Sequence, residues 1–144
     1  MSGESVAAAL GRFRDANRLD HDEHLAPRWI VKAGWFAFPL PNFAWRRRAI
    51  GAHDVHHVIT GYPCTVMGEL LIAAWELGAG RYPHWGATLF CMPLVVIGLF
   101  AAPRDIWTAY RRGRSQRTLY HPEILAGLLD RPFAEARSFV ERRG

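Results

Sequence analysis

The sequence has little cysteine and almost no lysine, and these scarcities exclude several classes of protein. Its 144 residues include two cysteines, too few for a disulfide-stabilised scaffold. Lys32 is the single lysine among eighteen basic residues; the others are arginine. The first twenty residues lack the apolar segment of a secretory signal peptide, so we expect no secretion. The chain has no internal repeat, and no run alternates β-branched with polar residues, so strands are not expected.

What the chain does contain is typical of a folded helical protein. Half of its residues are hydrophobic and 12% are aromatic, and its length suits one domain, 1–144. The spacing of the apolar residues predicts an all-α, single-domain helical bundle. Helices are predicted over 4–18, 46–60, 66–78, 121–129 and about 130–142. The aromatic-rich stretch 28–45 contains Pro39 and Pro41, which interrupt a helix, and is either a core element or an interfacial anchor.

The positive charge is concentrated in the second part of the chain. Charges cancel over residues 1–45, so the net charge of +5 arises after them, in an arginine cluster at 46–48 and another at 104–117. Nucleic-acid binding, anionic lipid head groups and a solvated surface each account for such clusters. Because both clusters flank apolar segments and no nucleic-acid-binding motif is visible, the pattern favours lipid, and we expect no nucleic-acid partner.

Residues 82–103 contain no aspartate, glutamate, lysine or arginine, and His84 lies near the start of this run. As a helix this run would be about 33 Å long, enough to cross a bilayer core of roughly 30 Å. Pro93 lies in its middle, however. Three interpretations stay open: a membrane span, a segment lying in the membrane interface, and a buried central helix of a bundle.

The most informative residues are His53, Asp54 and His57, which lie within five positions. In a helix, His53 and His57 are one turn apart on the same face, an arrangement that presents two imidazoles to one metal ion. The turn at 61–63 lies midway between these histidines and Glu69. If the two helices fold back as a hairpin, Glu69 lies level with the histidines, so the sequence predicts a metal site of two imidazoles and one or two carboxylates.

These polar residues also have ordinary structural explanations. Asp54 and Glu69 are each able to pair with arginine, and the histidines are able to form a polar network without metal. Glu76 lies about 10 Å beyond Glu69 along a helix, so we expect it to bind arginine or to orient a substrate. The pattern His53-x-x-His56-His57 resembles one histidine box of the membrane di-iron desaturases, but the chain has seven histidines and lacks the several spanning helices that those enzymes need.

The segment 53–61, HDVHHVITG, resembles the signature of the Coq-four family of ubiquinone (coenzyme Q) biosynthesis proteins. That signature is His-Asp-x-x-His, eleven further residues, and Glu, and the matching residues are His53, Asp54, His57 and Glu69. The similarity extends over about 45–140 and includes the strings YRRGR at 110–114 and LDRP at 129–132. His56 stands where the family commonly carries a bulky aromatic residue.

The resemblance implies an all-helical fold attached peripherally to the inner, cytoplasmic face of a membrane. It implies a divalent metal, usually zinc, at His53, Asp54, His57 and Glu69; this donor set also suits iron or manganese. It further implies oxidative decarboxylation at ring carbon 1 of a polyprenyl-benzoate intermediate. The expected partners are the polyprenylated aromatic lipid, the membrane surface, other quinone-biosynthesis proteins and a second copy in a homodimer.

Four residues receive roles in this scheme. Asp54 is expected to act as a displaceable ligand or a base, and Glu69 to share the catalytic site. Arg114 is expected to hold the substrate carboxylate, and Glu76 to contact the substrate. Two other functions stay open: a non-catalytic lipid-binding or scaffold protein whose metal is structural, and an integral membrane protein of another function.

Overall fold

The computed structural model describes residues 3–22, 25–33, 36–80 and 82–142, and the fold over these residues is all-α apart from one short hairpin. The helices are α1 (Val6–Asn17), α2 (Ala44–Thr60), α3 (Val66–Ala79), α4 (Trp85–Ala101), α5 (Pro103–Arg114), α6 (Pro122–Leu129) and α7 (Phe133–Glu141). The strands are β1 (Arg28–Ala33) and β2 (Phe36–Pro41). The predicted all-α class and the five predicted helical segments are therefore confirmed.

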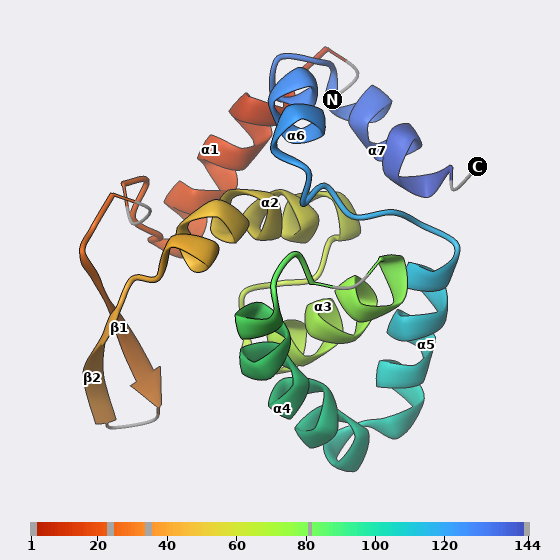
Figure 1. The fold of residues 1–144 in the computed structure, drawn as a ribbon. Coiled ribbons are helices and arrows are strands. Elements are labelled where there is room, and N and C mark those ends of the chain that lie inside the picture. The colour runs from red at the N-terminus through yellow and green to blue at the C-terminus, as the bar shows by residue number, and fades with distance from the viewer. Residues whose placement is uncertain (1–2, 23–24, 34–35, 81, 143–144) are drawn as a thin grey trace.

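The helices form two groups on either side of α2 (Figure 1). One group consists of α1, α6 and α7, and the other of α3, α4 and α5. The chain segment before α1 pairs with the segment before α7, because Val6 donates to the Arg131 carbonyl and Phe133 donates to the Glu4 carbonyl. Since α2 lies between the groups, its side chains reach both of them, and it can carry a site that draws on several helices.

Helix α3 packs most closely against α5. Gly113 of α5 lies directly on the Trp75 carbonyl of α3, and a Cβ there would overlap that oxygen. Trp75 itself is fully buried, and its indole N–H donates to Gln116 at 2.6 Å. This close contact holds the α3 backbone in place in the region next to Glu76.

Residues 103–114 form a helix that the sequence pattern did not predict separately. Pro103 occupies its first turn, where a missing N–H costs nothing. Ile106, Ala109 and Gly113 recur at helical spacing and are its buried residues. The arginines that suggested only a basic cluster occupy the solvent side and the last turn of α5, where cations favour the helix dipole.

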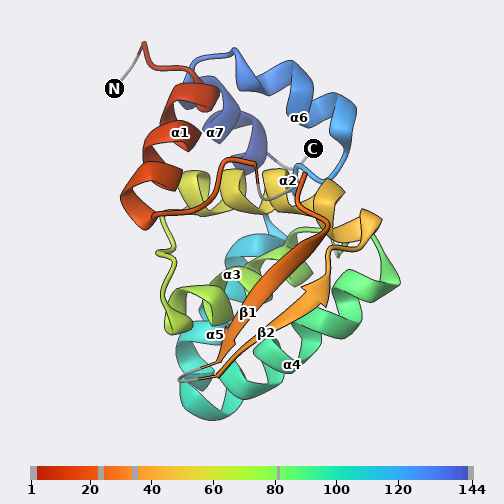
Figure 2. The same cartoon turned by 90° about the vertical axis from the view of Figure 1, so that its left-hand side faces the viewer.

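The expectation that strands are absent was wrong for residues 28–41. Strands β1 and β2 pair antiparallel, with Arg28 opposite Pro41 and Ala33 opposite Phe36. Each strand is an edge strand because the sheet has two strands, and edges tolerate the missing N–H groups of Pro39 and Pro41. In Figure 2 the hairpin projects from the start of α2 and passes in front of α3, α4 and α5. The side chains of Trp29, Trp35, Phe36 and Phe38, expected to be core or anchor residues, lie outside the described residues.

The uncharged run 82–103 contains α4, which is buried on one side and exposed on the other. Gly86, Ala87, Val95 and Gly98 are its buried residues. Large apolar side chains are exposed over the rest of its surface: Trp85, Leu89, Phe90, Val96, Ile97, Leu99 and Phe100. The interpretation of this run as a buried central helix of a bundle is therefore wrong for the exposed side of α4. Among the residues that the structure describes, no helix has both the length and the apolar character needed to cross a membrane.

Candidate metal centre

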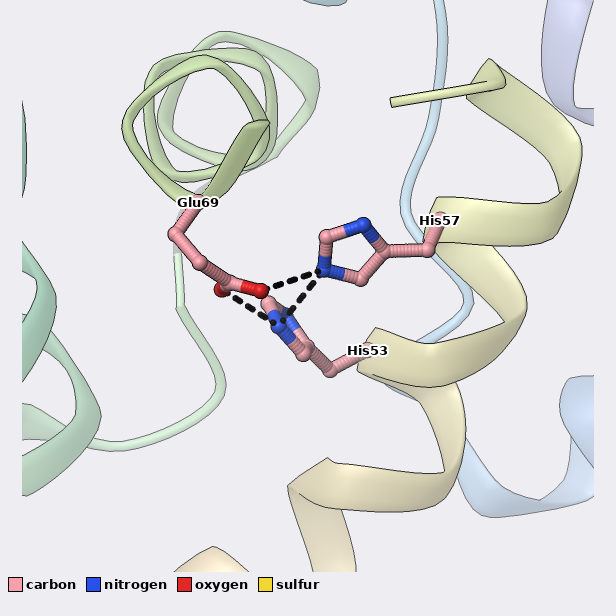
Figure 3. A group of neighbouring side chains, drawn as sticks. All are labelled: His53, His57 and Glu69. Carbon is pink, nitrogen blue, oxygen red and sulfur yellow. Dashed lines mark hydrogen bonds and ion pairs between the residues drawn. The ribbon is translucent and has the colours of Figure 1, made fainter. Parts of the chain in front are cut away.

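The candidate site lies between the last turns of α2 and the first turn of α3. His53 and His57 project from α2 one turn apart, and Glu69 projects from α3 (Figure 3). Helix α2 ends at Thr60 and is capped by Gly61, whose φ of 79° favours glycine and whose N–H donates to the His57 carbonyl. The expected turn between two helices is present, and it brings Glu69 level with the histidines as predicted.

The short connection fixes how closely α3 approaches α2. Thr65 caps α3 by accepting a hydrogen bond from the Gly68 N–H at 3.2 Å. A Cβ on Gly68 would overlap the Pro63 carbonyl oxygen, so only glycine lets the connection lie directly on the first turn of α3. This close approach holds Glu69 within reach of the two imidazoles.

Three potential ligand atoms converge at this point. The Nε2 atoms of His53 and His57 are 3.2 Å apart. The Glu69 carboxylate oxygens lie 3.5 Å from His53 Nε2 and 3.4 Å from His57 Nε2. All of these atoms fall within 4.8 Å of one another, a spacing suited to a single bound ion.

In each of the two histidines, the hydrogen-bond partner of Nδ1 determines whether Nε2 is free of a proton and able to bind a metal ion. His57 Nδ1 is 2.8 Å from the Tyr62 carbonyl oxygen, which only accepts, so this nitrogen carries the proton. His53 Nδ1 is 2.9 Å from a carboxylate oxygen of Glu76 and carries its proton for the same reason. In their neutral forms both rings therefore direct Nε2 lone pairs at each other, which repel unless a cation lies between them. Two such imidazoles beside a carboxylate fit a divalent metal ion.

The histidines and carboxylates around the site shift one another's pKa values. Burial by itself would lower the pKa of His53, but the carboxylates of Glu76 and Glu69 outweigh it and raise that pKa well above its usual value. Burial would raise the pKa of Glu69, yet hydrogen bonds to both histidines lower it to about 2. The raised pKa favours protonation of His53, and a proton on its Nε2 would compete with a metal ion for the same place between the two rings.

Asp54 is not one of the three converging groups. One of its carboxylate oxygens, Oδ2, forms an ion pair with Arg14 of α1, at 2.9 Å from Nε and 2.8 Å from the terminal nitrogen. Burial raises the pKa of Asp54, and the Arg14 guanidinium opposes that rise. Asp54 therefore ties α2 to α1 in this structure, and its expected role as a metal ligand or base stays a prediction.

Glu76 is fully buried and lies behind His53. One of its carboxylate oxygens accepts hydrogen bonds from both His53 and His56, at 2.9 and 2.8 Å. Burial would raise the pKa of Glu76, but these two histidines hold it well below its usual range. The expectation that Glu76 binds arginine or orients a substrate stays a prediction, because in this structure its carboxylate interacts with His53, His56 and Tyr120.

Sequence reasoning missed His56 as part of this arrangement. Its ring is fully buried, and its Nε2 accepts a hydrogen bond from the backbone N–H of Leu119 at 2.8 Å. The signal in the sequence was a histidine on the apolar side of α2, next to Val55 and Ile59, which needs a buried polar partner.

A cavity of about 220 Å³ opens beside the ligand atoms, between α2 and α4. His53 and Glu69 form its polar end, and its remaining lining is mostly apolar: Trp45, Ala49, Ile50, Ala87, Phe90, Cys91, Leu94 and Tyr120. Arg46 supplies a cation to this lining. Arg114, expected to hold a carboxylate, lies instead where α5 meets Gly78 of α3, about 14 Å along the helix from Glu69.

No family model, curated protein or solved structure matches the chain. The resemblance to the Coq-four signature therefore stays a prediction, carried by His53, Asp54, His57 and Glu69 and by the strings that follow them.

Proposed function

We propose that the protein is a metal-dependent enzyme that acts at a membrane surface on a polyprenylated aromatic carboxylate in ubiquinone assembly. The proposed reaction is oxidative decarboxylation at ring carbon 1, in which a hydroxyl group replaces the carboxylate. The observation that carries the proposal is the convergence of two imidazole acceptors and one carboxylate at the polar end of an apolar cavity. The sequence resemblance supplies the pathway and the substrate.

The ligand set suits catalysis better than a purely structural role. Three protein ligands leave a position open for water or substrate, whereas structural zinc sites are usually closed by four. A divalent ion held there supplies Lewis-acid polarisation of a bound carboxylate or phenolate. Replacing the carboxylate by a hydroxyl group releases carbon dioxide and removes two electrons from the substrate. We propose that molecular oxygen accepts these two electrons and leaves as hydrogen peroxide, while water supplies the hydroxyl oxygen. The imidazole and carboxylate ligands suit iron and manganese as well as zinc.

The cavity suggests how this chain holds the substrate. Its apolar lining accommodates an aromatic ring, and Arg46 is placed to pair with a carboxylate that approaches His53 and Glu69. The Arg46 guanidinium also donates to Asn42 at 3.1 Å, which restrains its position. We therefore assign carboxylate binding to Arg46 in preference to Arg114.

The exposed side of α4 is the surface on which we place the membrane. Phe100 is 86% exposed and Trp85 is 73% exposed, and α4 itself has no charged side chain. Trp107 of α5 is also exposed, so tryptophans stand near both ends of this apolar surface, as is common at membrane interfaces. The adjoining cavity between α2 and α4 allows the polyprenyl tail to stay in contact with lipid.

A turnover assay tests the enzymatic proposal. The metal-free protein is reconstituted with zinc, iron or manganese and supplied with a polyprenylated hydroxybenzoate in vesicles under air, and mass spectrometry follows loss of carbon dioxide and gain of the hydroxyl. We expect product with at least one metal, and an increase in KM for Arg46→Gln but not for the control Arg48→Gln, two residues away on the same helix. Metal binding without product under any of these conditions would contradict the enzyme and favour the lipid-binding or scaffold protein with a structural metal.

Vesicle co-sedimentation tests the membrane surface separately. Wild-type protein is expected to sediment with vesicles that contain anionic phospholipid. Phe100→Ser should weaken this binding, whereas Leu25→Ser, which removes another exposed apolar side chain outside α4, should not. Equal binding by the two variants would show that α4 is not the contact surface.

A further inference from the structure

Behind the candidate metal centre lies a buried chain of hydrogen bonds that no ligand role explains. It runs from the Leu119 backbone N–H to His56, from His56 to Glu76, and from Glu76 to His53. His56 and Glu76 are both fully buried. The chain thus joins the segment that follows α5 to a potential ligand on α2, across a gap of more than sixty residues in the sequence.

Each proton in this chain has a determined position. A backbone N–H only donates, so His56 Nε2 is the acceptor and His56 Nδ1 carries the proton that goes to Glu76. Glu76 in turn accepts from His53 Nδ1 with the same oxygen, and this leaves His53 Nε2 without a proton in the neutral ring. The Leu119 amide assigns the tautomer of His56, and the Glu76 carboxylate assigns that of His53.

We infer that Glu76 and His56 are positioning residues for the metal centre, which fix the ring orientation and tautomer of His53 so that its Nε2 is the ligand atom. This inference rests on the metal centre of the proposed function. Carboxylates that accept the second N–H of a ligating histidine raise the basicity of that histidine and hold its ring, and losing them typically weakens metal binding about 10- to 100-fold.

The charge of Glu76 fits this role. The described residues that contact its carboxylate include neither lysine nor arginine, although a buried charge is costly unless it is paired. Its other oxygen, Oε2, is buried as well, and the Tyr120 hydroxyl is the uncharged group that interacts with this carboxylate beside the two histidines. Glu69 and Glu76 together carry the two negative charges that a divalent ion would neutralise.

The test compares zinc affinity, measured by competition with a chromophoric chelator, between the wild type and three variants. Glu76→Gln keeps the shape and removes the charge, and we expect it to weaken zinc binding by at least about tenfold. His56→Phe removes one donor to Glu76, and we expect a smaller loss. The control is Tyr82→Phe, which removes a buried hydroxyl that donates to the Ala73 carbonyl of α3 at 2.6 Å, and it should bind zinc as the wild type does.

Two further readouts separate positioning from a general loss of structure. With cobalt in place of zinc, Glu76→Gln should change the visible absorption spectrum, because a neutral amide oxygen accepts the His53 N–H more weakly than a carboxylate and leaves the ring less basic. Tyr82→Phe should not change it. In the metal-free wild type, ¹⁵N NMR should find His56 with its proton on Nδ1 and none on Nε2, a measurement that needs no variant to fold.

Several results would overturn the inference. They are zinc binding by Glu76→Gln as tight as that of the wild type, an equal loss in Tyr82→Phe, and a proton on His56 Nε2. Failure of the proposed function gives different results. If the wild type binds no zinc, the metal centre itself is contradicted. If it binds zinc without turnover, the enzymatic activity is contradicted, but the positioning role of Glu76 and His56 is not.

Discussion

The substitution Glu69→Gln tests the metal centre most directly, because Glu69 is the single carboxylate among the three converging groups. Glutamine keeps the size of the side chain and removes its negative charge. The carboxylate oxygens lie 3.5 and 3.4 Å from the Nε2 atoms of His53 and His57, so one change removes both the charge and a ligand. We expect the variant to fold and to bind zinc more weakly by on the order of 100-fold.

The size of the expected effect follows from linkage between binding and unfolding. Zinc at 100 times its Kd stabilises the wild type by about 2.7 kcal/mol. In a chain of this length, 1 kcal/mol raises the melting temperature by about 3 °C, so the wild-type shift is about 8 °C. After a loss of about 100-fold in affinity the same zinc concentration equals Kd, and the stabilisation falls to about 0.4 kcal/mol, or about 1 °C.

Thermal unfolding with and without zinc, followed by circular dichroism, measures both shifts. The control is Glu123→Gln, which removes a glutamate from the first turn of another helix, α6, where it is exposed. The reasoning is refuted if zinc stabilises Glu69→Gln as much as the wild type. It is also refuted if Glu123→Gln loses the shift, since zinc would then be binding elsewhere.

Three other predictions concern packing, pH and thiol reactivity. Gly113→Ala should lower the free energy of unfolding by about 1–3 kcal/mol because its methyl group overlaps a carbonyl of α3, whereas Gly127→Ala, with open space around it, should be neutral or stabilising; urea unfolding compares them. In the metal-free protein the pKa of Glu69 is about 2 against 4.5 for the free side chain, so its stabilising contribution is present above about pH 4.5 and lost as the pH falls towards 2; acid titration of the wild type should show a component that Glu69→Gln lacks. Burial raises the pKa of Cys64 to about 11 and that of Cys91 to about 12, so a thiol reagent at pH 8 should modify the folded protein on the order of 100-fold more slowly than the urea-unfolded chain, and equal rates would contradict these pKa values.

The spacing of residues in the sequence predicts one part of the site and leaves the rest undetermined. His53 and His57 are one helical turn apart, and the turn at 61–63 lies midway between them and Glu69, so the three groups meet as soon as the two helices form and fold back. Nothing beyond helix geometry and a short connection is needed, and this is why the sequence predicted the convergence correctly. The same periodicity predicted most of the helices.

The partners of the neighbouring polar residues depended on packing between distant segments. Asp54 stands next to His53 in the sequence, but α1 brings Arg14 against it from forty residues away. Glu76 lies seven residues beyond Glu69 on α3, and in the fold it is fully buried against His53 and His56 of α2. Side-chain periodicity states which face of a helix is apolar; it does not state which helix covers that face.

By itself the sequence determined the helical class and the convergence of His53, His57 and Glu69, because both follow from spacings within one helix or across one tight turn. Only the tertiary structure decided that 28–41 forms a hairpin, that one side of α4 is exposed, and that a buried network stands behind His53. The physical reason is that these features depend on the angles and distances between packed elements, which side chains of many segments set together.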